Sequence, residues 1–180
     1  MEFWKQYFNT LSMSVVNANL SDLDKSVKVI KNSSQKGGKI IIVGNGGSAA
    51  MASHVAVDLT KVAQVSAITF NDADLITCFA NDYGYENWVE KGIEFYSAPD
   101  DVAVLISSSG KSENILRGAK KAKERGLKVL TFSGFNPNNP LRQIGNINFW
   151  VDSKEYNIVE MTHQAWLLGI VDKIAGDKRR

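Results

Sequence analysis

The amino-acid sequence predicts an α/β fold: a doubly wound, parallel, five-stranded sheet of the flavodoxin or Rossmann type, preceded by an N-terminal helical extension. Short, almost wholly apolar segments alternate with segments of helical periodicity, which is typical of a parallel sheet covered on both faces. The first 36 residues show only helical periodicity and end at Gly37 and Gly38. A length of 180 residues suits a single domain. We therefore expect residues 1–36 to be helices used for oligomerisation and residues 37–180 to be the α/β core.

The elements can be placed in order along the chain. In the N-terminal extension, apolar residues recur three and four positions apart from Phe3 to Val15 and from Leu20 to Ile30, with a helix start signal at Ser21 and Asp22. Strands are expected at 39–43, 65–70, 101–106, 128–132 and 147–151. Helices are expected at 47–61, 72–80, 85–95, 112–125 and 156–174. Because ligands of such sheets bind at the carboxyl ends of the strands, the loops after the first and third strands are the candidate site.

Composition and charge exclude several classes of protein. The sequence is 44% hydrophobic and 22% charged, which is a globular composition rather than that of a disordered chain. Its 21 Lys and Arg residues nearly balance 19 Asp and Glu residues, so we expect neither a nucleic-acid partner nor a membrane partner. The single cysteine, Cys78, cannot form an internal disulfide bond. We found no signal-peptide pattern, and we expect a cytoplasmic protein.

The loop after the first expected strand reads Gly44-Asn45-Gly46-Gly47-Ser48 and opens a helix. Glycines allow positive φ angles and a close approach of a ligand to the backbone, although a tight strand-to-helix turn is the simpler explanation. The spacing Gly44-x-Gly46-x-x-Ala49 also matches a loose dinucleotide fingerprint, but the acidic residue that should end the second strand is displaced to Asp72. A dinucleotide-binding protein is thus a minor alternative, and no nucleotide cofactor is expected.

The loop after the third expected strand reads Ser107-Ser108-Ser109-Gly110-Lys111-Ser112 and also opens a helix. Hydroxyl groups and free N–H groups at a helix N-terminus form a phosphate site, whereas Ser109 or Ser112 alone could serve as a helix cap. The loop is not a nucleoside-triphosphate loop, because the first glycine of that motif would fall at Leu105. Four serines exceed what capping needs, which favours phosphate binding.

Both histidines lie at helical spacing from an acidic residue. His54 is four residues before Asp58, and Glu160 is three residues before His163, so each pair shares one side of a helix. Each pair could be only a surface ion pair. If the two helices meet, the four groups could bind Zn²⁺ or act as an acid and a base. A further polar segment, Asn81-Asp82-Tyr83-Gly84, is expected to break the chain before a helix; there Asp82 could bind sugar hydroxyls or could serve as a turn and helix cap.

These motifs, in this order and over essentially the whole chain, resemble the sugar isomerase (SIS) domain family, especially the phosphoheptose isomerases. The resemblance implies a homotetramer with shared sites that interconverts sedoheptulose 7-phosphate and a heptose 7-phosphate for surface polysaccharides. It implies that phosphate is held by Ser107, Ser108, Ser109 and Ser112. It implies that the sugar is lined by Asn45, Gly46, Gly47, Ser48 and Asp82, and we add the neighbouring Asn81. It places His54, Asp58 and Glu160 at positions that bind metal or carry catalysis.

The sequence also departs from the family pattern. The family usually has Glu at Asp58, Gln at Glu160 and a catalytic His at Leu168, and its chain after Lys61 is longer. We predict an aldose–ketose isomerase with Asp58 or Glu160 as base and His163 as acid. In this prediction a zinc ion is held by His54, Asp58, Glu160 and His163. The alternative is a non-catalytic SIS protein that binds a phosphorylated sugar or docks a protein partner, as a replication-initiator-associated relative does.

Overall fold

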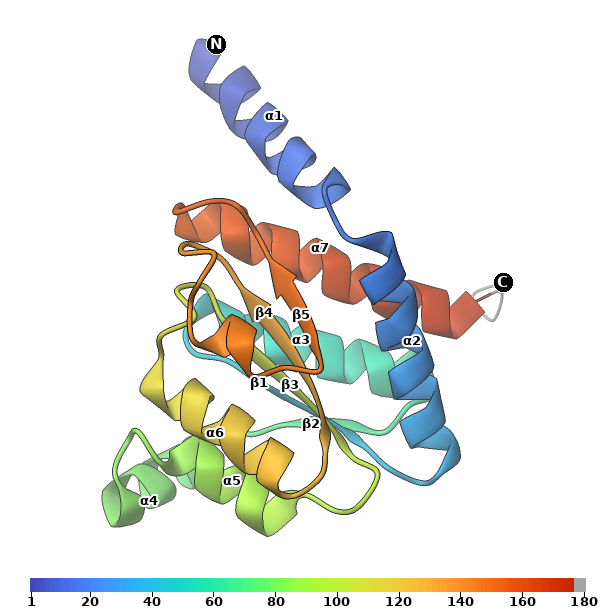
Figure 1. Ribbon diagram of the computed structural model, residues 1–180, viewed down its shortest axis with the longest axis vertical. Helices are drawn as coiled ribbons and strands as arrows, with labels where there is room; N and C mark the ends of the chain where they lie inside the picture. Colours follow the sequence, from blue (N-terminus) through green and yellow to red (C-terminus); the bar gives the residue numbers. More distant parts are fainter. Residues whose placement is uncertain (177–180) are drawn as a thin grey trace.

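A computed structural model describes residues 1–176 of the chain. Its centre is a five-stranded sheet in the order β2-β1-β3-β4-β5, in which every neighbouring pair is parallel. This confirms the predicted fold class (Figure 1). The strands are β1 (Ile40–Val43), β2 (Ala67–Thr69), β3 (Val102–Ser107), β4 (Lys128–Ser133) and β5 (Ile147–Trp150).

Helices cover both faces of the sheet, because alternate side chains of each strand point to opposite faces. Ile40 and Ile42 of β1 face a core completed by α2 (Leu20–Gln35), α3 (Gly47–Lys61) and α7 (Tyr156–Ala175). Ile41 and Val43 face a second core. That core is completed by α5 (Trp88–Tyr96) and α6 (Glu113–Glu124), with α4 (Ala73–Tyr83) packed at its side. A short 3₁₀ helix, η1 (Leu141–Gln143), lies between β4 and β5.

Several predicted boundaries differ from the structure: the helix expected at 85–95 begins at Trp88, and the strand expected at 65–70 covers only Ala67–Thr69. Two further differences concern the ends of helices. The first is the polar break expected at 81–84: α4 continues through Asn81 and Asp82 to Tyr83, and Gly84 ends it with a φ of 89°. The second is the start of α2, where the cap is Asn19 rather than Ser21 or Asp22. The Asn19 side chain accepts a hydrogen bond from the backbone N–H of Asp22. The start of α2 is set by a side chain that accepts a hydrogen bond from a free backbone N–H group, and the end of α4 is set by a glycine that can adopt a positive φ.

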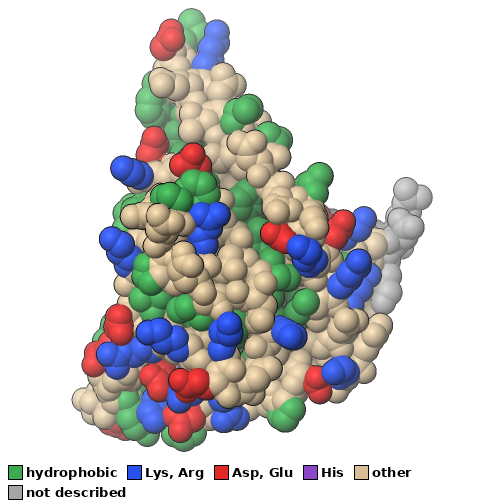
Figure 2. Space-filling view, in the orientation of Figure 1, with side chains coloured by type: hydrophobic (Ala, Val, Ile, Leu, Met, Phe, Trp, Pro, Cys, Tyr) green, Lys and Arg blue, Asp and Glu red, His purple; other side chains and the backbone are tan. Residues whose placement is uncertain are grey.

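The first helix, α1 (Glu2–Val16), projects from the α/β core (Figure 1). Its aromatic side chains Phe3, Trp4 and Phe8 are all at least 59% exposed, and apolar side chains are visible along this projection in Figure 2. The indole N–H of Trp166 donates a hydrogen bond to the carbonyl oxygen of Val15 and so ties the end of α1 to α7. No helix among residues 1–176 is long and apolar enough to span a membrane.

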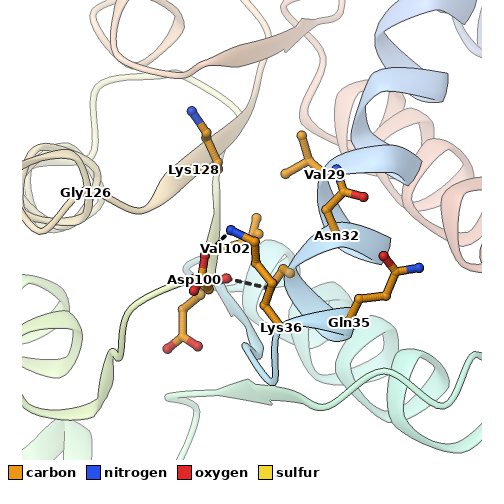
Figure 3. A pocket seen from close by; sticks show the side chains of 10 residues that line it. Val29, Asn32, Gln35, Lys36, Asp100, Val102, Gly126 and Lys128 are labelled. Atoms are coloured by element: carbon orange, nitrogen blue, oxygen red, sulfur yellow. Dashed lines mark hydrogen bonds and ion pairs between the residues drawn. The ribbon is translucent and has the colours of Figure 1, made fainter.

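A hollow of about 330 Å³ lies at the amino end of the sheet, between α2 and β3 (Figure 3). Both acidic residues that line it are paired within the chain: Lys36 Nζ lies 2.8 Å from Asp100, and Lys39 Nζ lies 2.6 Å from the buried Asp101. The Ser33 hydroxyl also donates a hydrogen bond to the carbonyl oxygen of Asp100. The contacts of Ser33 and Lys36 fasten the end of α2 to the sheet, and the Lys39–Asp101 pair joins the starts of β1 and β3. The candidate site lies at the opposite end of the sheet.

Candidate functional site

The order of the strands places the site at the carboxyl ends of β1 and β3. From β1 the chain crosses to β2 on one side and then returns to β3 on the other, so the connections diverge between these two strands. Such a switch point leaves a crevice in which open α/β sheets bind ligands. The glycine loop follows β1 and the serine loop follows β3, as predicted. The fold therefore brings the two motifs side by side.

Two asparagine side chains join the loops. Asn45 donates to Asn114 at 3.0 Å and accepts from Asn114 at 2.9 Å, and the Tyr85 hydroxyl lies 3.3 Å from the same Asn45 oxygen. The amide of Asn45 thus holds the glycine loop against the start of α6. Gly46 has a φ of 55°, which explains a glycine at this position. Of the other predicted sugar-binding residues here, Gly46 and Gly47 are exposed and Ser48 is buried.

The serine loop leaves donors at the start of α6 without a side-chain cap. Ser112 precedes the helix, but its hydroxyl lies 2.9 Å from the Ser107 hydroxyl and makes no capping bond. Ser109 accepts a hydrogen bond from the backbone N–H of Lys111. The hydroxyl of Ser108 is buried and has no hydrogen-bond partner among residues 1–176. Uncapped N–H groups beside an unsatisfied hydroxyl suit a phosphate, and capping alone does not explain this loop.

A second part of the site is an open pocket of about 450 Å³ between α3 and α7. Gly47 at the start of α3 connects this pocket to the glycine loop. A carboxylate oxygen of Glu160 from α7 lies so close to Gly47 that a Cβ there would collide with it. Glu160 has no hydrogen-bond or ion-pair partner within the described residues, and partial burial raises the pKa of its carboxyl group. The lining residues are Gly47, Ala50, Met51, His54, Glu160, Met161, Gln164 and Leu168.

His54 projects from α3 into the same pocket and is held from two sides. Its Nε2 atom lies 3.4 Å from the Asp58 carboxylate, one turn further along α3. Its Nδ1 atom lies 3.1 Å from the side-chain nitrogen of Gln164, which comes from α7. Sequence reasoning missed Gln164, although its position four residues after Glu160 places it on the same side of α7.

The prediction that His163 is the catalytic acid and a zinc ligand is wrong. Its side chain is fully buried and its ring packs against Phe132 and Trp166. Its Nε2–H donates a hydrogen bond to the carbonyl oxygen of Ser133 at 3.0 Å. Burial lowers the pKa of His163 to about 4, so the ring is neutral at physiological pH. His163 therefore belongs to the core beneath α7 and cannot reach a substrate.

The four predicted zinc ligands also fail to form a site within this chain. No group of three or more His, Cys, Asp and Glu side chains suited to a metal ion occurs among the described residues. His163 lies in the core, and one ring nitrogen of His54 already faces Gln164. His54 pairs with Asp58 on α3 and shares a pocket with Glu160 from α7, but the three side chains do not form one cluster suited to a metal ion. We therefore assign no step of a reaction to a metal.

The structure does not bring Asn81 and Asp82 into the pocket between α3 and α7. Both side chains are exposed on the last turn of α4, where Asn81 donates a hydrogen bond to Asp82. Asp82 is not the helix cap considered from the sequence, because it lies inside α4. A sugar-binding role for either residue stays a prediction.

Comparisons with known proteins show the family and the fold of the chain. Residues 3–134 match the family described as the SIS domain. The chain is 36% identical over 142 residues to the phosphoheptose isomerase of Aquifex aeolicus, covering 75% of this chain and 73% of that protein. It is 32% identical over 166 residues to the probable phosphoheptose isomerase of Thermoplasma acidophilum, covering 88% and 90%. The solved structure of phosphoheptose isomerase from Neisseria gonorrhoeae matches with a TM-score of 0.87 at 23% identity, covering 96% of this chain and 97% of that one, which shows a shared fold.

The family match ends at residue 134, before β5 and α7. Both loops and His54 fall inside the matched stretch. Glu160, Gln164 and Leu168, which face them from α7, fall outside it. The family match therefore says nothing about the residues that α7 contributes to the pocket.

Proposed function

This chain belongs to the SIS domain family, and we propose that it is an aldose–ketose isomerase that interconverts sedoheptulose 7-phosphate and a heptose 7-phosphate. Relatives named phosphoheptose isomerase, one of them 32% identical over 88% of the chain, support the choice of substrate. The product would serve the synthesis of heptose-containing surface polysaccharides. The residues at the switch point supply the two functions that such a reaction needs, which are a phosphate anchor and a base.

The serine loop anchors the phosphate in this proposal. The uncapped N–H groups at the start of α6 and the hydroxyl of Ser108 offer hydrogen bonds, and the helix dipole favours an anion at this end. Ser107, Ser109 and Ser112 surround these donors. The sugar then extends past Gly46 and Gly47 toward the pocket between α3 and α7.

Glu160 acts as the base. Its carboxylate removes a proton from C1 of the ketose, and the electron pair of that C–H bond forms the C1=C2 double bond while negative charge moves to O2. The imidazole of His54 stabilises this charge with an N–H donor, and the hydroxyl proton of O1 passes to O2. Protonated Glu160 then returns its proton to C2, which leaves the carbonyl group at C1. A carboxyl group with a raised pKa suits this exchange of one proton, because the best catalytic pKa approaches the working pH.

One observation carries this assignment: Glu160 from α7 and His54 from α3 line one pocket that begins at the glycine loop. The test is turnover of sedoheptulose 7-phosphate by the purified chain, followed by the anomeric proton of the cyclic product in NMR spectra. Glu160→Gln, which keeps the shape but removes the base, should lower kcat by a factor of about 100 to 10,000 and leave substrate binding in place. Full activity of this variant would remove Glu160 from the reaction.

A non-catalytic SIS protein is the second candidate. It is favoured by a specific observation: His163 is sealed in the core, and the pocket position where the resemblance expects a histidine is Leu168. Such a protein would keep the phosphate anchor and bind the sugar without converting it. Binding of sedoheptulose 7-phosphate by calorimetry, with no turnover and no exchange of the C1 protons with deuterated solvent, would select this candidate.

We also propose a cytoplasmic homotetramer with sites shared between subunits. The exposed aromatic side chains of α1 support self-association, since a helix with such a face is usually covered by a partner. Light scattering coupled to size-exclusion chromatography measures the oligomer. Trp4→Glu should reduce the oligomer if α1 forms the contact, and an unchanged mass would contradict that role.

A further inference from the structure

Gln164 links the two helices that form the pocket, and its partner is the only histidine in the pocket. Its side-chain nitrogen lies 3.1 Å from Nδ1 of His54, and the other ring nitrogen, Nε2, lies 3.4 Å from the Asp58 carboxylate. The ring is therefore held between an amide from α7 and a carboxylate from its own helix. Gln164 is itself only partly buried, so this contact is not forced by core packing.

This arrangement selects one tautomer of His54. A neutral imidazole has one N–H donor and one nitrogen lone pair, while a carboxylate can only accept hydrogen bonds. The N–H therefore lies on Nε2, toward Asp58, and the lone pair of Nδ1 accepts from the amide N–H₂ of Gln164. The opposite amide orientation would place the proton on Nδ1 and a lone pair of Nε2 against the Asp58 carboxylate, which is unfavourable.

We propose that Gln164 is a positioning residue that holds His54 with its Nε2–H toward Asp58, where the long contact of 3.4 Å leaves this N–H able to donate also to the developing charge of the substrate, and that His54 does not serve as a metal ligand. The inference rests on the proposed isomerase function for its kinetic part. A histidine binds a metal through a nitrogen lone pair, and here the only lone pair of the neutral ring is occupied by Gln164.

The tautomer can be measured without any turnover. The chain has two histidines, so ¹⁵N-histidine labelling gives two ring systems, which His54→Gln assigns. His163 is an internal reference, because its Nε2–H donates to the carbonyl oxygen of Ser133. At a pH where both rings are neutral, we expect His54 to show a protonated Nε2 and an unprotonated Nδ1. A protonated Nδ1 on His54 would overturn the proposal, as would a shift of its ring signals on addition of an equimolar amount of Zn²⁺ alone.

Enzyme kinetics distinguish a residue that positions His54 from one that only packs α7 against α3. Gln164→Met keeps the length of the side chain but removes the donor, and Gln143→Met on the exposed η1 surface is the matched control. We expect Gln164→Met to lower kcat by at least about tenfold with KM changed by less than about threefold, because a misplaced catalytic group slows the chemical step. A change only in thermal stability, with kcat equal to that of the control, would show a structural role and refute the proposal.

The two proposals can fail separately. If the chain does not convert sedoheptulose 7-phosphate, the isomerase function fails, and the NMR result still decides the tautomer of His54. Gln164→Glu provides a further check, because a carboxylate beside Nδ1 would draw a second proton onto the ring. We expect the His54 signals of that variant to move toward the doubly protonated form while those of His163 stay in place. Unchanged His54 signals would contradict the contact with residue 164.

Discussion

Acidification should destabilise this protein through His163, the buried histidine of α7. Its ring is fully buried and donates one hydrogen bond to the carbonyl oxygen of Ser133, while its Nδ1 atom has no partner among the described residues. Burial lowers the pKa of His163 from 6.5 to about 4. The folded chain therefore holds this ring neutral over a pH range in which the unfolded chain protonates it.

The sign and size of the effect follow from this difference. Between pH 6.5 and about 4 the unfolded state binds more protons than the folded state, so stability falls as the pH falls. Above pH 6.5 both states hold a neutral ring and the effect vanishes. Preferential protonation of the unfolded chain corresponds to a loss of about 2 kcal/mol at about pH 5 and about 3 kcal/mol at about pH 4.

Urea unfolding of the wild type and of His163→Gln at about pH 7.5 and about pH 5 measures this effect. The glutamine amide can still donate to the carbonyl oxygen of Ser133 but does not titrate. The variant should be less stable at the higher pH because it leaves a cavity, yet it should lose about 2 kcal/mol less than the wild type on acidification. Contributions of the carboxylates are common to both proteins and cancel. An equal loss in both proteins would refute the assignment of His163 to the core.

Three further predictions concern the site itself. Ser108→Ala should weaken binding of sedoheptulose 7-phosphate by about five- to tenfold in calorimetry. It should change the free energy of unfolding by less than about 0.5 kcal/mol, because the hydroxyl has no partner to lose among the described residues. An unchanged Kd would place the phosphate elsewhere. Gly47→Ala should keep or raise the Tm, since alanine favours a helix over glycine by up to about 1 kcal/mol. It should nevertheless lower kcat, because the new Cβ would displace the Glu160 carboxylate. Full activity would contradict the placement of Glu160. Treatment with EDTA should leave turnover unchanged, because the described residues offer no cluster of metal ligands; a loss restored by Zn²⁺ would show a metal site.

The fold and both loops could be predicted from the sequence because each depends on local signals. Apolar β-branched segments such as Ile40–Val43 have few alternatives to a buried strand, and glycines or serines between a strand and a helix mark a ligand loop. The sequence could not show that Asn45 and Asn114, 69 residues apart, would join the loops, since this depends on β1 and β3 being neighbours. The contact of His54 with Gln164, across 110 residues, depends likewise on how α7 packs on α3.

The misassignment of His163 has a physical cause that applies to any amphipathic helix. Glu160 and His163 are three residues apart, so their directions on α7 differ by about 60°, and the boundary between the core and the pocket falls between them. Gln164 differs from Glu160 by only about 40°, and Leu168 continues the same stripe, which is why these residues line the pocket. The sequence did contain a warning, because the positions three, four and seven residues after His163 are all buried apolar residues: Trp166, Leu167 and Ile170. A histidine within such a stripe belongs to the core, whatever carboxylate stands three residues before it, and the pocket chemistry of α7 must come from the stripe of Glu160 and Gln164.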